Sequence, residues 1–367
     1  MHKSNTQGGY TMPSPNPDLS RGRRSLHNQS GAKCKLISAH PAMTLSLLIP
    51  LPLLAVLAAL SPAFAQTTPT APATAISADG TPTLKIASSL VAVSAVVRDK
   101  SGQPVANLTR KDFLLKQDGK PQPITYFSQG SDLPLTLALM VDTSGSQRSY
   151  IPDEIAAGHA FFPAMLTRPD DRAVLVQFDN AILQLVKITG SVTTLEHGLA
   201  YLTQSHSDYT APGRGGGTLL FDAVIAVSHI ELGDQLGRRA MVILTDGGDR
   251  GSHFNAKQAI AEAQRADIMI YTIYYSDGGG DEDILKNLSR QTGGREFSVN
   301  SKMTLQDIYT AIAGDLRLQY EIGYRPPDPR PDKYHKIDLK AANKSLTVQA
   351  RDGYFTPAGP VASGAAK

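Results

Sequence analysis

The fold is decided by one stretch, Leu137-Ala138-Leu139-Met140-Val141-Asp142-Thr143-Ser144-Gly145-Ser146. Five apolar residues lead directly into one carboxylate and two hydroxyls spaced two residues apart. Gly145 permits the loop to curl, so that these oxygen atoms can converge on one point. In a doubly wound sheet the loops at the carboxyl ends of the strands form the ligand crevice. The stretch therefore predicts a buried strand that ends in a ligand site.

From residue 133 onward, apolar strands alternate with amphipathic helices, which is the pattern of a parallel sheet built from βα units. Strands are expected at 134–141, 172–178, 182–187, 239–245, 267–275 and 295–299. Helices are expected at 149–166, 193–203, 219–231, 255–265, 281–292 and 304–316. The sequence thus predicts an α/β fold with a doubly wound, mostly parallel six-stranded sheet over residues 132–316.

Both flanks of this region have strand signals without helices. On the amino-terminal side, residues 84–98 alternate like a strand, Asp99–Gly102 marks a turn and Gln117–Lys120 marks a hairpin that leads to a strand at 124–127. On the other side, strands are expected at 316–324, 334–340 and 346–351. Neither flank has enough strands to be stable alone. We therefore expect 84–131 and 317–356 to form one small β-sandwich-like domain, with the α/β domain inserted in it.

Two further segments bring oxygen atoms towards Asp142. The strand at 239–245 leads into Asp246, and the two strands flank the topological switch point, which places these carboxylates side by side. Such carboxylates repel each other unless a cation balances them. The glycine run 215–217 delivers the hydroxyl of Thr218 at the start of a helix. Oxygen atoms without His or Cys favour a hard divalent cation, with Mg²⁺ expected and Mn²⁺ or Ca²⁺ as alternatives.

Three motifs together resemble the metal-ion-dependent adhesion site (MIDAS) of von Willebrand factor A (VWA) domains: Asp142-Thr143-Ser144-Gly145-Ser146, Gly217-Thr218 with Phe221-Asp222-Ala223, and Thr245-Asp246-Gly247. The resemblance implies a VWA, Rossmann-like fold and five metal ligands, which are Asp142, Ser144, Ser146, Thr218 and Asp246. It also implies an open coordination position that accepts an Asp or Glu of a protein partner. Runs in the flanks are similar to the secreted VWFA-related proteins of the Acidobacteria type, among them Val97–Gly102, Leu108–Phe113 and Ala350–Phe355.

The motifs do not favour an enzyme. Val141–Gly145 is similar to the catalytic turn of an aspartic protease, but its glycine comes one place late and no second copy supplies a dyad. The G-x-S-x-G elbow of a serine hydrolase and the lysine of a phosphate loop are also missing. The acidic loop Asp277–Asp283 does not follow EF-hand spacing, so we expect it to cap the next helix. We expect a protein-binding or adhesion module; the alternative is a structural or assembly protein of the cell envelope whose cation stabilises the fold.

The first 65 residues have the pattern of an export signal. Thr44–Leu60 is apolar and uncharged, basic residues precede it, and Ala63-Phe64-Ala65 fits a cleavage site. We expect a signal peptide with a long n-region at 1–65, a flexible linker at 66–83 and a tail at 357–367. The mature protein would be periplasmic or extracellular, without a membrane span. An uncleaved signal anchor is the alternative, because the apolar run approaches the ~20 residues that cross a bilayer.

Composition and charge narrow the class of partner. Hydrophobic residues make up 41% of the chain and charged residues 19%, as in an ordinary globular protein. The whole chain has a formal net charge of +3. Residues 1–65 alone have a net charge of +5, so the mature chain would have 3 − 5 = −2. This charge does not suggest nucleic acid as a partner. The single cysteine, Cys34, precedes the apolar run, so we expect no disulfide in the mature protein.

Overall fold

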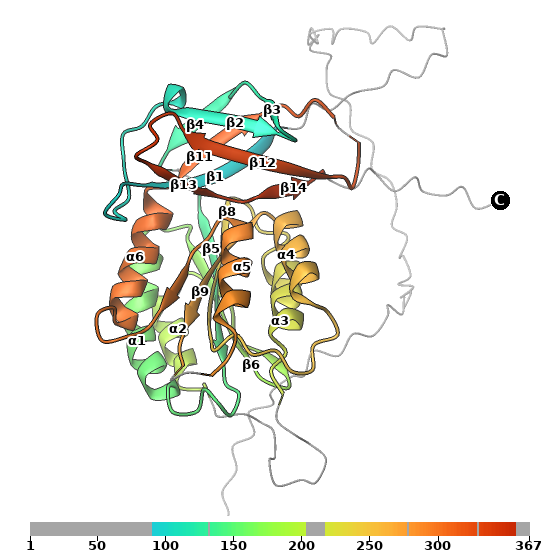
Figure 1. Ribbon diagram of the computed structural model, residues 1–367. Coiled ribbons are helices and arrows are strands. Elements are labelled where there is room, and N and C mark those ends of the chain that lie inside the picture. The colour runs from blue at the N-terminus through green and yellow to red at the C-terminus, as the bar shows by residue number, and fades with distance from the viewer. Residues whose placement is uncertain (1–89, 131–132, 203–216, 277–278, 329, 357–367) are drawn as a thin grey trace, which may run out of the picture. The chain divides into compact units, whose positions relative to one another are not determined.

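The computed structural model describes residues 90–130, 133–202, 217–276, 279–328 and 330–356 (Figure 1). The expected signal peptide, linker and tail, and residues 84–89 of the first expected strand, lie outside these ranges. Within them, no helix has the length and apolar character that crossing a membrane requires. The described strands form one sheet of six strands and two sheets of four.

The six-stranded sheet has the order β10-β9-β8-β5-β6-β7. Neighbouring strands are parallel, except that β7 runs antiparallel to β6 at one edge. The strand bounds are β5 Leu135–Asp142, β6 Arg172–Phe178, β7 Ile182–Thr189, β8 Arg238–Thr245, β9 Ile268–Tyr274 and β10 Glu296–Ser298. The first strand in sequence, β5, lies between β6 and β8, so the chain winds outwards in both directions from it. This order confirms the expected doubly wound, mostly parallel sheet.

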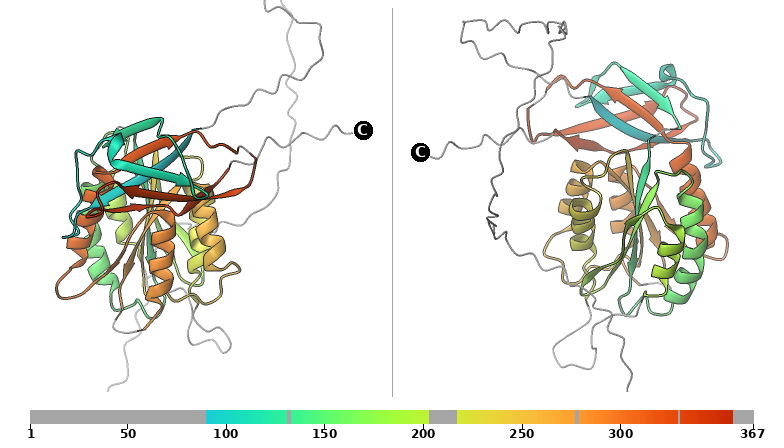
Figure 2. Two further views of the ribbon diagram at one scale, coloured as in Figure 1. Left: turned by 45° about the horizontal axis from the view of Figure 1, so that its top comes forward. Right: turned by 180° about the vertical axis from the view of Figure 1, so that it is seen from behind.

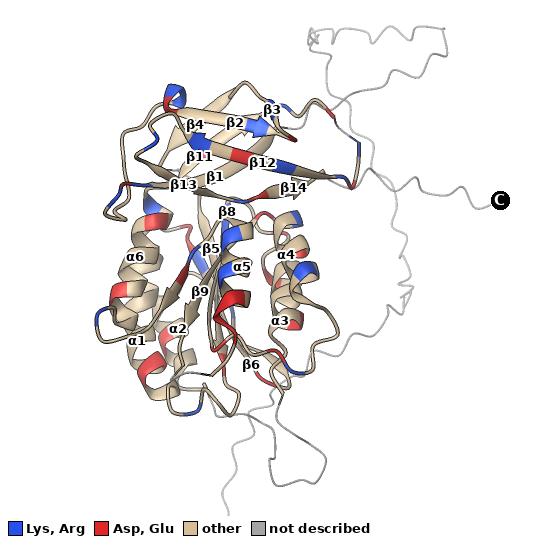
Figure 3. Cartoon of the chain, viewed as in Figure 1, with Lys and Arg blue, Asp and Glu red and all other residues tan. Residues whose placement is uncertain are grey.

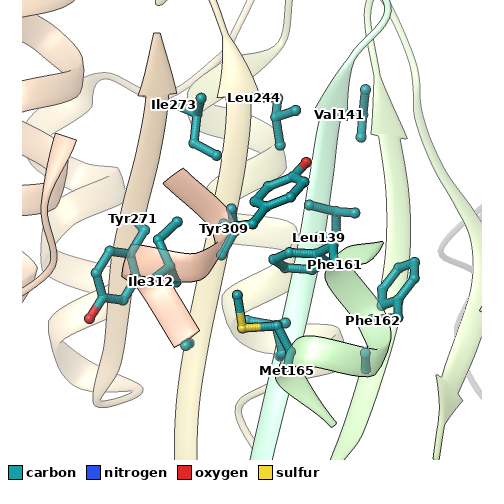
Figure 4. Close-up of a cluster of buried hydrophobic side chains, with 14 of the residues drawn as sticks. Leu139, Val141, Phe161, Phe162, Met165, Leu244, Tyr271, Ile273, Tyr309 and Ile312 are labelled. Atoms are coloured by element: carbon teal, nitrogen blue, oxygen red, sulfur yellow. The ribbon is translucent and has the colours of Figure 1, made fainter. Parts of the chain in front are cut away.

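Helices cover both faces of this sheet (Figure 1). Their bounds are α1 Ile151–Met165, α2 Val192–Leu199, α3 Leu220–Ala226, α4 Ala256–Arg265, α5 Glu282–Thr292 and α6 Leu305–Arg317. Leu137 and Leu139 of β5 point to one face and pack with α1, α2 and α6, in the cluster that Figure 4 shows. Ala138 and Met140 point to the other face and pack with α3, α4 and α5. All eight residues of β5 are buried because its alternating side chains enter two cores.

Local sequence explains where several helices begin and end. Asn255 and Thr304 cap α4 and α6 through reciprocal capping boxes. Asp281 accepts a hydrogen bond from the Ile284 amide and so caps α5, which is the role expected for the acidic loop. Gly293 ends α5 at a φ of +90°, a conformation that favours glycine.

The helix expected at 219–231 is different in the structure. It is α-helical only to Ala226, and Val227–Glu231 (η2) forms a π-helical turn. The Ser228 hydroxyl donates to the Val224 carbonyl at 2.7 Å, and the Leu232 amide donates to the Val227 carbonyl five residues back. Hydrogen bonds of a serine side chain to the preceding turn compete with regular helical bonding, and periodicity alone does not reveal them.

The two flanks combine into a β-sandwich, which Figure 2 shows from two sides. One sheet has the order β13-β1-β11-β4 and the other β14-β12-β2-β3. The bounds are β1 Val91–Arg98, β2 Phe113–Gln117, β3 Lys120–Pro121, β4 Tyr126–Gln129, β11 Tyr320–Tyr324, β12 Tyr334–Ala341, β13 Thr347–Ala350 and β14 Gly353–Phe355. Strand β1 pairs with β11 and β13, and β2 pairs with β12, so each sheet contains both flanks. Buried side chains of both sheets form one core.

Three details of the flanks differ from expectation. The hairpin at Gln117–Lys120 is present, but the next strand, β4, joins the other sheet by pairing with β11. The strand expected from 316 begins only at Tyr320, because the apolar stripe of α6 continues through Leu316. Strand β14 was not expected, since three residues are too few for a recognisable alternation.

Charged side chains join the sandwich to the α/β domain. Arg98 of β1 forms an ion pair with Asp315 of α6. Arg351, which follows β13, contacts the Asp267 carboxylate at 2.7 Å and donates to the Ala92 carbonyl at 2.6 Å. The same contact region encloses a cavity of about 160 Å³, lined in part by Glu321 and Arg351. These contacts lie at the amino-terminal edge of the six-stranded sheet, opposite to the carboxyl end of β5.

Candidate metal centre

The loop after β5 gathers three of the expected ligands. Asp142 is the last residue of β5 and is fully buried. The Ser144 amide donates to Asp142 Oδ1 at 2.9 Å, which curls the loop back onto the carboxylate. The hydroxyl oxygens of Ser144 and Ser146 lie 3.3 Å apart. The structure therefore brings Asp142, Ser144 and Ser146 together, with Ser146 on the exposed side.

The neighbouring strand β8 supplies Thr245, which the sequence placed in a motif of the site but not among the expected ligands. Val141 pairs with Leu244, so Asp142 and Thr245 end adjacent strands. The Thr245 hydroxyl donates to Asp142 Oδ2 at 2.6 Å and accepts from the Gly247 amide at 3.1 Å. Both oxygens of Asp142 thus accept hydrogen bonds from the protein. The detectable signal was a threonine directly before Asp246 at the end of a strand.

Asp246 is held next to this cluster by its own loop and by the loop before α5. Its Oδ1 accepts from the Gly248 amide at 2.8 Å, and its carbonyl accepts from the Asp281 amide at 2.8 Å. The approach at Gly280 is so close that a Cβ there would lie 2.0 Å from the Asp246 carbonyl oxygen. Only glycine fits at this position, which has a φ of +89°. Asp246 is mostly buried, and its charge acts on Asp142.

Thr218 reaches the same edge of the sheet through its backbone. Its amide donates to the Arg250 carbonyl at 3.0 Å, and its carbonyl accepts from the Arg250 amide at 2.8 Å. The next amide, of Leu219, donates to the Asp179 carbonyl directly after β6. Thr218 is therefore fixed between the loops that follow β8 and β6, the two neighbours of β5. Residues 203–216, which include most of the expected glycine run, lie outside the described residues.

The electrostatics of the cluster oppose an ionised Asp142 in the metal-free protein. Burial raises the pKa of Asp142, hydrogen bonds from Thr245 and Ser144 lower it, and the Asp246 charge raises it, so that the pKa of Asp142 is about 6. Two carboxylates and several hydroxyls without imidazole or thiolate form a donor set that suits a hard cation. Among the described residues, no three His, Cys, Asp or Glu side chains gather as a metal-binding group. The site fits a cation only through its mixed carboxylate and hydroxyl oxygens.

Two buried polar residues of the α1 region were not expected. Gln147 follows Ser146 directly and is fully buried, and Glu154 in the first turns of α1 is 2% exposed. Burial, the Asp142 charge and the Asp153 charge raise the pKa of Glu154 well above its usual value. A glutamate among helical surface positions is ordinary in sequence, so nothing but its position on the inward face of α1 distinguishes it.

The comparisons with known proteins give distant structural likenesses. No family model and no curated protein matches the sequence. The von Willebrand factor type A protein from Catenulispora acidiphila has a TM-score of 0.43 at 9% identity, with 72% of this chain and 73% of that chain covered. Conserved hypothetical protein BatB from Bacteroides thetaiotaomicron has a TM-score of 0.40 at 13% identity, with 50% and 97% covered.

A third similar structure is proximal thread matrix protein 1 from the mussel byssus, with a TM-score of 0.42 at 15% identity. The match covers 60% of this chain and 50% of the mussel chain. Because these TM-scores and sequence identities are low, we infer nothing about ligands or partners from these structures. The α/β fold class rests on the strand order and on the helices that cover both faces of the sheet.

Proposed function

We propose that this chain is an exported, non-enzymatic binding protein that captures a protein partner through a divalent cation. The observation that carries the proposal is the Asp142 carboxylate at the end of β5. It is buried, lies beside a second carboxylate, and is fixed by hydrogen bonds from Thr245 and Ser144. A buried, oriented anion with a like-charged neighbour is a strained arrangement in the protein alone and a favourable one beside a cation.

The expected ligands are Asp142, Ser144, Ser146, Thr218 and Asp246. Their oxygen atoms favour Mg²⁺, with Mn²⁺ or Ca²⁺ as alternatives. A bound ion supplies an electrophilic position that accepts a carboxylate oxygen. We therefore propose that the partner is a protein that presents an Asp or Glu side chain.

The contacts of the site support binding rather than catalysis. Asp142 accepts hydrogen bonds from a hydroxyl and an amide, which hold it in place and do not take up protons. The Ser144 hydroxyl lies 3.3 Å from the hydroxyl of Ser146 and also interacts with the Asp142 carboxylate, so it belongs to the same cluster of oxygen donors. Acidic and basic side chains are interspersed over the described elements in the view of Figure 3, which supports a protein partner rather than a nucleic acid. The apolar run Thr44–Leu60 with its small-residue cleavage pattern supports export to the periplasm or the cell exterior.

A pull-down from envelope extract of the organism that encodes the chain tests this proposal. We expect capture of one specific protein in Mg²⁺, and loss of that capture in EDTA and with Asp142→Ala. Asp234→Ala, on an exposed loop after η2, is the matched control and should behave like the wild type. Capture that persists in EDTA and in Asp142→Ala would contradict the proposal.

The same variants separate the alternative, a structural or assembly protein of the envelope. For such a protein, EDTA and Asp142→Ala would chiefly lower the melting temperature, because a cation that binds only the folded state stabilises it. Circular dichroism during heating, with and without Mg²⁺, measures this effect beside the pull-down.

A further inference from the structure

Three buried polar side chains come from the ligand loop and from the two helices α1 and α6. Gln147, Glu154 and Tyr309 are 0%, 2% and 0% exposed. Within the described part of the chain, the side-chain polar atoms of all three have no hydrogen-bond partner. Burial of an amide, a carboxyl and a hydroxyl without partners is unfavourable, so each of them is expected to bind a further polar group.

The backbone of the first turns before and within α1 places two of these residues on one face. The Gln147 amide donates to the Ser144 carbonyl at 3.0 Å, the Tyr150 amide to the Gln147 carbonyl at 2.9 Å, and the Glu154 amide to the Tyr150 carbonyl at 3.0 Å. Gln147 and Glu154 are seven residues apart, which is two helical turns. Gln147 therefore lies at the end of the ligand loop, and Glu154 lies two turns further along the chain in α1.

Tyr309 of α6 approaches the same region from the other helix on this face. Its ring packs on Phe161 of α1, with the ring centroids 4.4 Å apart. In Figure 4 its hydroxyl points towards Val141 and Leu244, the residues that directly precede Asp142 and Thr245. The Asp142 charge acts on Glu154, and the Glu154 charge acts in turn on Tyr309. Glu154 of α1 therefore lies within electrostatic range of both Asp142 and Tyr309, and its carboxyl oxygens have no hydrogen-bond partner in the described part of the chain.

A bound hard cation would supply hydrogen-bond donors to these groups through its water. Mg²⁺ retains several of its water molecules when it binds to proteins, and each of these waters donates strong hydrogen bonds. A carboxylate and an amide oxygen are suitable acceptors for them. Residues that hydrogen-bond to the ligands of a metal, without touching the metal, commonly orient those ligands.

We propose that Glu154 and Gln147 are positioning residues of the metal centre, which accept hydrogen bonds from the water molecules of the bound cation on the core side of Asp142. This inference rests on the proposed function, because it requires that the centre binds a cation. Asp142 and Asp246 would then hold the ion directly, while Glu154 would act only through hydrogen bonds and would not be a metal ligand.

Calorimetric titration of the full-length protein with Mn²⁺ tests the role of Glu154. We expect Glu154→Gln to weaken Mn²⁺ binding about 10- to 100-fold. Asp153→Asn is the matched control: it is the adjacent residue of α1, is exposed, and hydrogen-bonds to Tyr275, so its affinity should stay within about twofold of the wild type. In EDTA the melting temperature of Glu154→Gln should equal or exceed that of the wild type, because a buried ionisable group has become neutral.

A second measurement keeps the inference testable if Glu154→Gln does not fold. Gln147→Leu, with Mn²⁺ bound, should change the relaxation of water protons, because a metal-bound water that has lost an acceptor exchanges faster. A purely structural role would change the melting temperature equally with and without Mn²⁺ and would leave this relaxation unchanged. Mn²⁺ affinity of Glu154→Gln within twofold of the wild type, or unchanged relaxation in Gln147→Leu, would overturn the inference. A wild-type protein that binds no Mn²⁺ would instead overturn the proposed function.

Discussion

The surroundings of Asp142 affect the ionisation of its carboxyl group in opposite directions. The fold buries its carboxylate completely and places Asp246 beside it, and both effects raise its pKa, which reaches about 6. Hydrogen bonds from Thr245 and Ser144 hold the same carboxylate in an orientation that suits an ionised group. In the metal-free protein above pH 6 the charge is therefore retained at a cost to stability.

This cost predicts that Asp142→Asn stabilises the metal-free protein. A folded-state pKa near 6 against 3.8 in the unfolded chain corresponds to about 3 kcal/mol at pH 8. The folded wild type binds the proton more tightly than the unfolded chain, so its stability falls as pH rises from about 4 to 6. The advantage of the variant should therefore be largest above pH 6 and disappear below pH 4. Urea unfolding in EDTA across this range measures the difference; a variant less stable than the wild type at pH 8 would refute the prediction.

Some residues of the site could be predicted from the sequence and others could not. The five expected ligands follow strand ends or a glycine run, and the structure places them at one edge of the sheet; their role in metal binding stays a prediction. The hydrogen bond from Thr245 to Asp142 was not predicted, because it depends on the register between β5 and β8. Glu154 was missed because its inward position depends on the rotation of α1.

At the scale of elements, glycines have opposite effects in a turn and in a helix. Asp118 and Gly119 form the two-residue turn between β2 and β3, with φ values of +50° and +79°. Turns of this kind match the twist of a hairpin but require a left-handed backbone. Gly314 lies inside α6 at an ordinary φ, and a Cβ at either glycine would meet no atom within 4 Å. The two positions therefore differ in backbone conformation and not in space.

We expect Gly119→Ala to lower the free energy of unfolding by about 1 kcal/mol, because alanine disfavours the left-handed conformation. Gly314→Ala should raise it by about 0.5–1 kcal/mol, because alanine has a higher helix propensity. Chemical denaturation of both variants beside the wild type measures these changes. Equal signs for the two variants would show that the effects do not come from the backbone.

The ion pair between Arg98 of β1 and Asp315 of α6 connects elements that are distant in sequence. Asp315 is fully buried and Arg98 nearly so. Removal of one partner leaves a buried charge unpaired, so Asp315→Leu should destabilise the protein by about 3–5 kcal/mol. The double variant Arg98→Met with Asp315→Leu should be more stable than Asp315→Leu alone. A double-mutant cycle by urea unfolding measures this, and strictly additive losses would contradict it.

Element type was predictable wherever one periodicity persisted. The six strands of the α/β domain begin and end within two residues of their expected bounds. The central strands β5, β6, β8 and β9 are mostly apolar segments between polar loops, which is the pattern that made them recognisable. The π-helical turn at Val227–Glu231 was not predictable, since it depends on the Ser228 hydroxyl bond. The late start of β11 has a similar origin: the apolar residues near 316 suit both a helix and a strand, and packing against α1 decides between them.

For the whole molecule, the contact between the sandwich and the α/β domain contains a titratable group. Glu321 of β11 is 6% exposed, lines the 160 Å³ cavity and accepts a hydrogen bond from the Ser94 hydroxyl at 2.7 Å. Burial raises the pKa of Glu321 to about 7, although the Ser94 bond and the charges of Arg238 and Arg351 lower it. The carboxyl is therefore protonated in the folded protein at a pH where the unfolded chain is ionised.

The protein should lose about 3 kcal/mol of stability as the pH rises from 4.5 to 7 through the ionisation of Glu321. The sign follows because the folded state binds the additional proton in this interval. Glu321→Gln should remove this part of the pH dependence, whereas the surface variant Asp234→Asn should retain it. Unfolding curves at several pH values in EDTA test the expectation, which fails if Glu321→Gln has the same pH profile as the wild type.

The arrangement of the whole chain was predictable only in outline. Short strands on both sides of a βα-repeating region indicated that the flanks combine, and the mixed composition of both four-stranded sheets agrees with that. Strand order within the sandwich could not be predicted, because the pairings of β1 with β11 and β13 join residues more than 200 positions apart. No local pattern contains such register information.

The pairing of β1 with strands from the far end of the chain also determines how the protein bears tension. When β1 and β14 are pulled apart, the load passes through the hydrogen bonds of the sandwich, while the connections of the inserted domain lie between β4 and β11, which are themselves paired. Under tension we therefore expect the strands of the sandwich to separate first. The edge of the six-stranded sheet that carries Asp142 should keep its structure until the sandwich has opened.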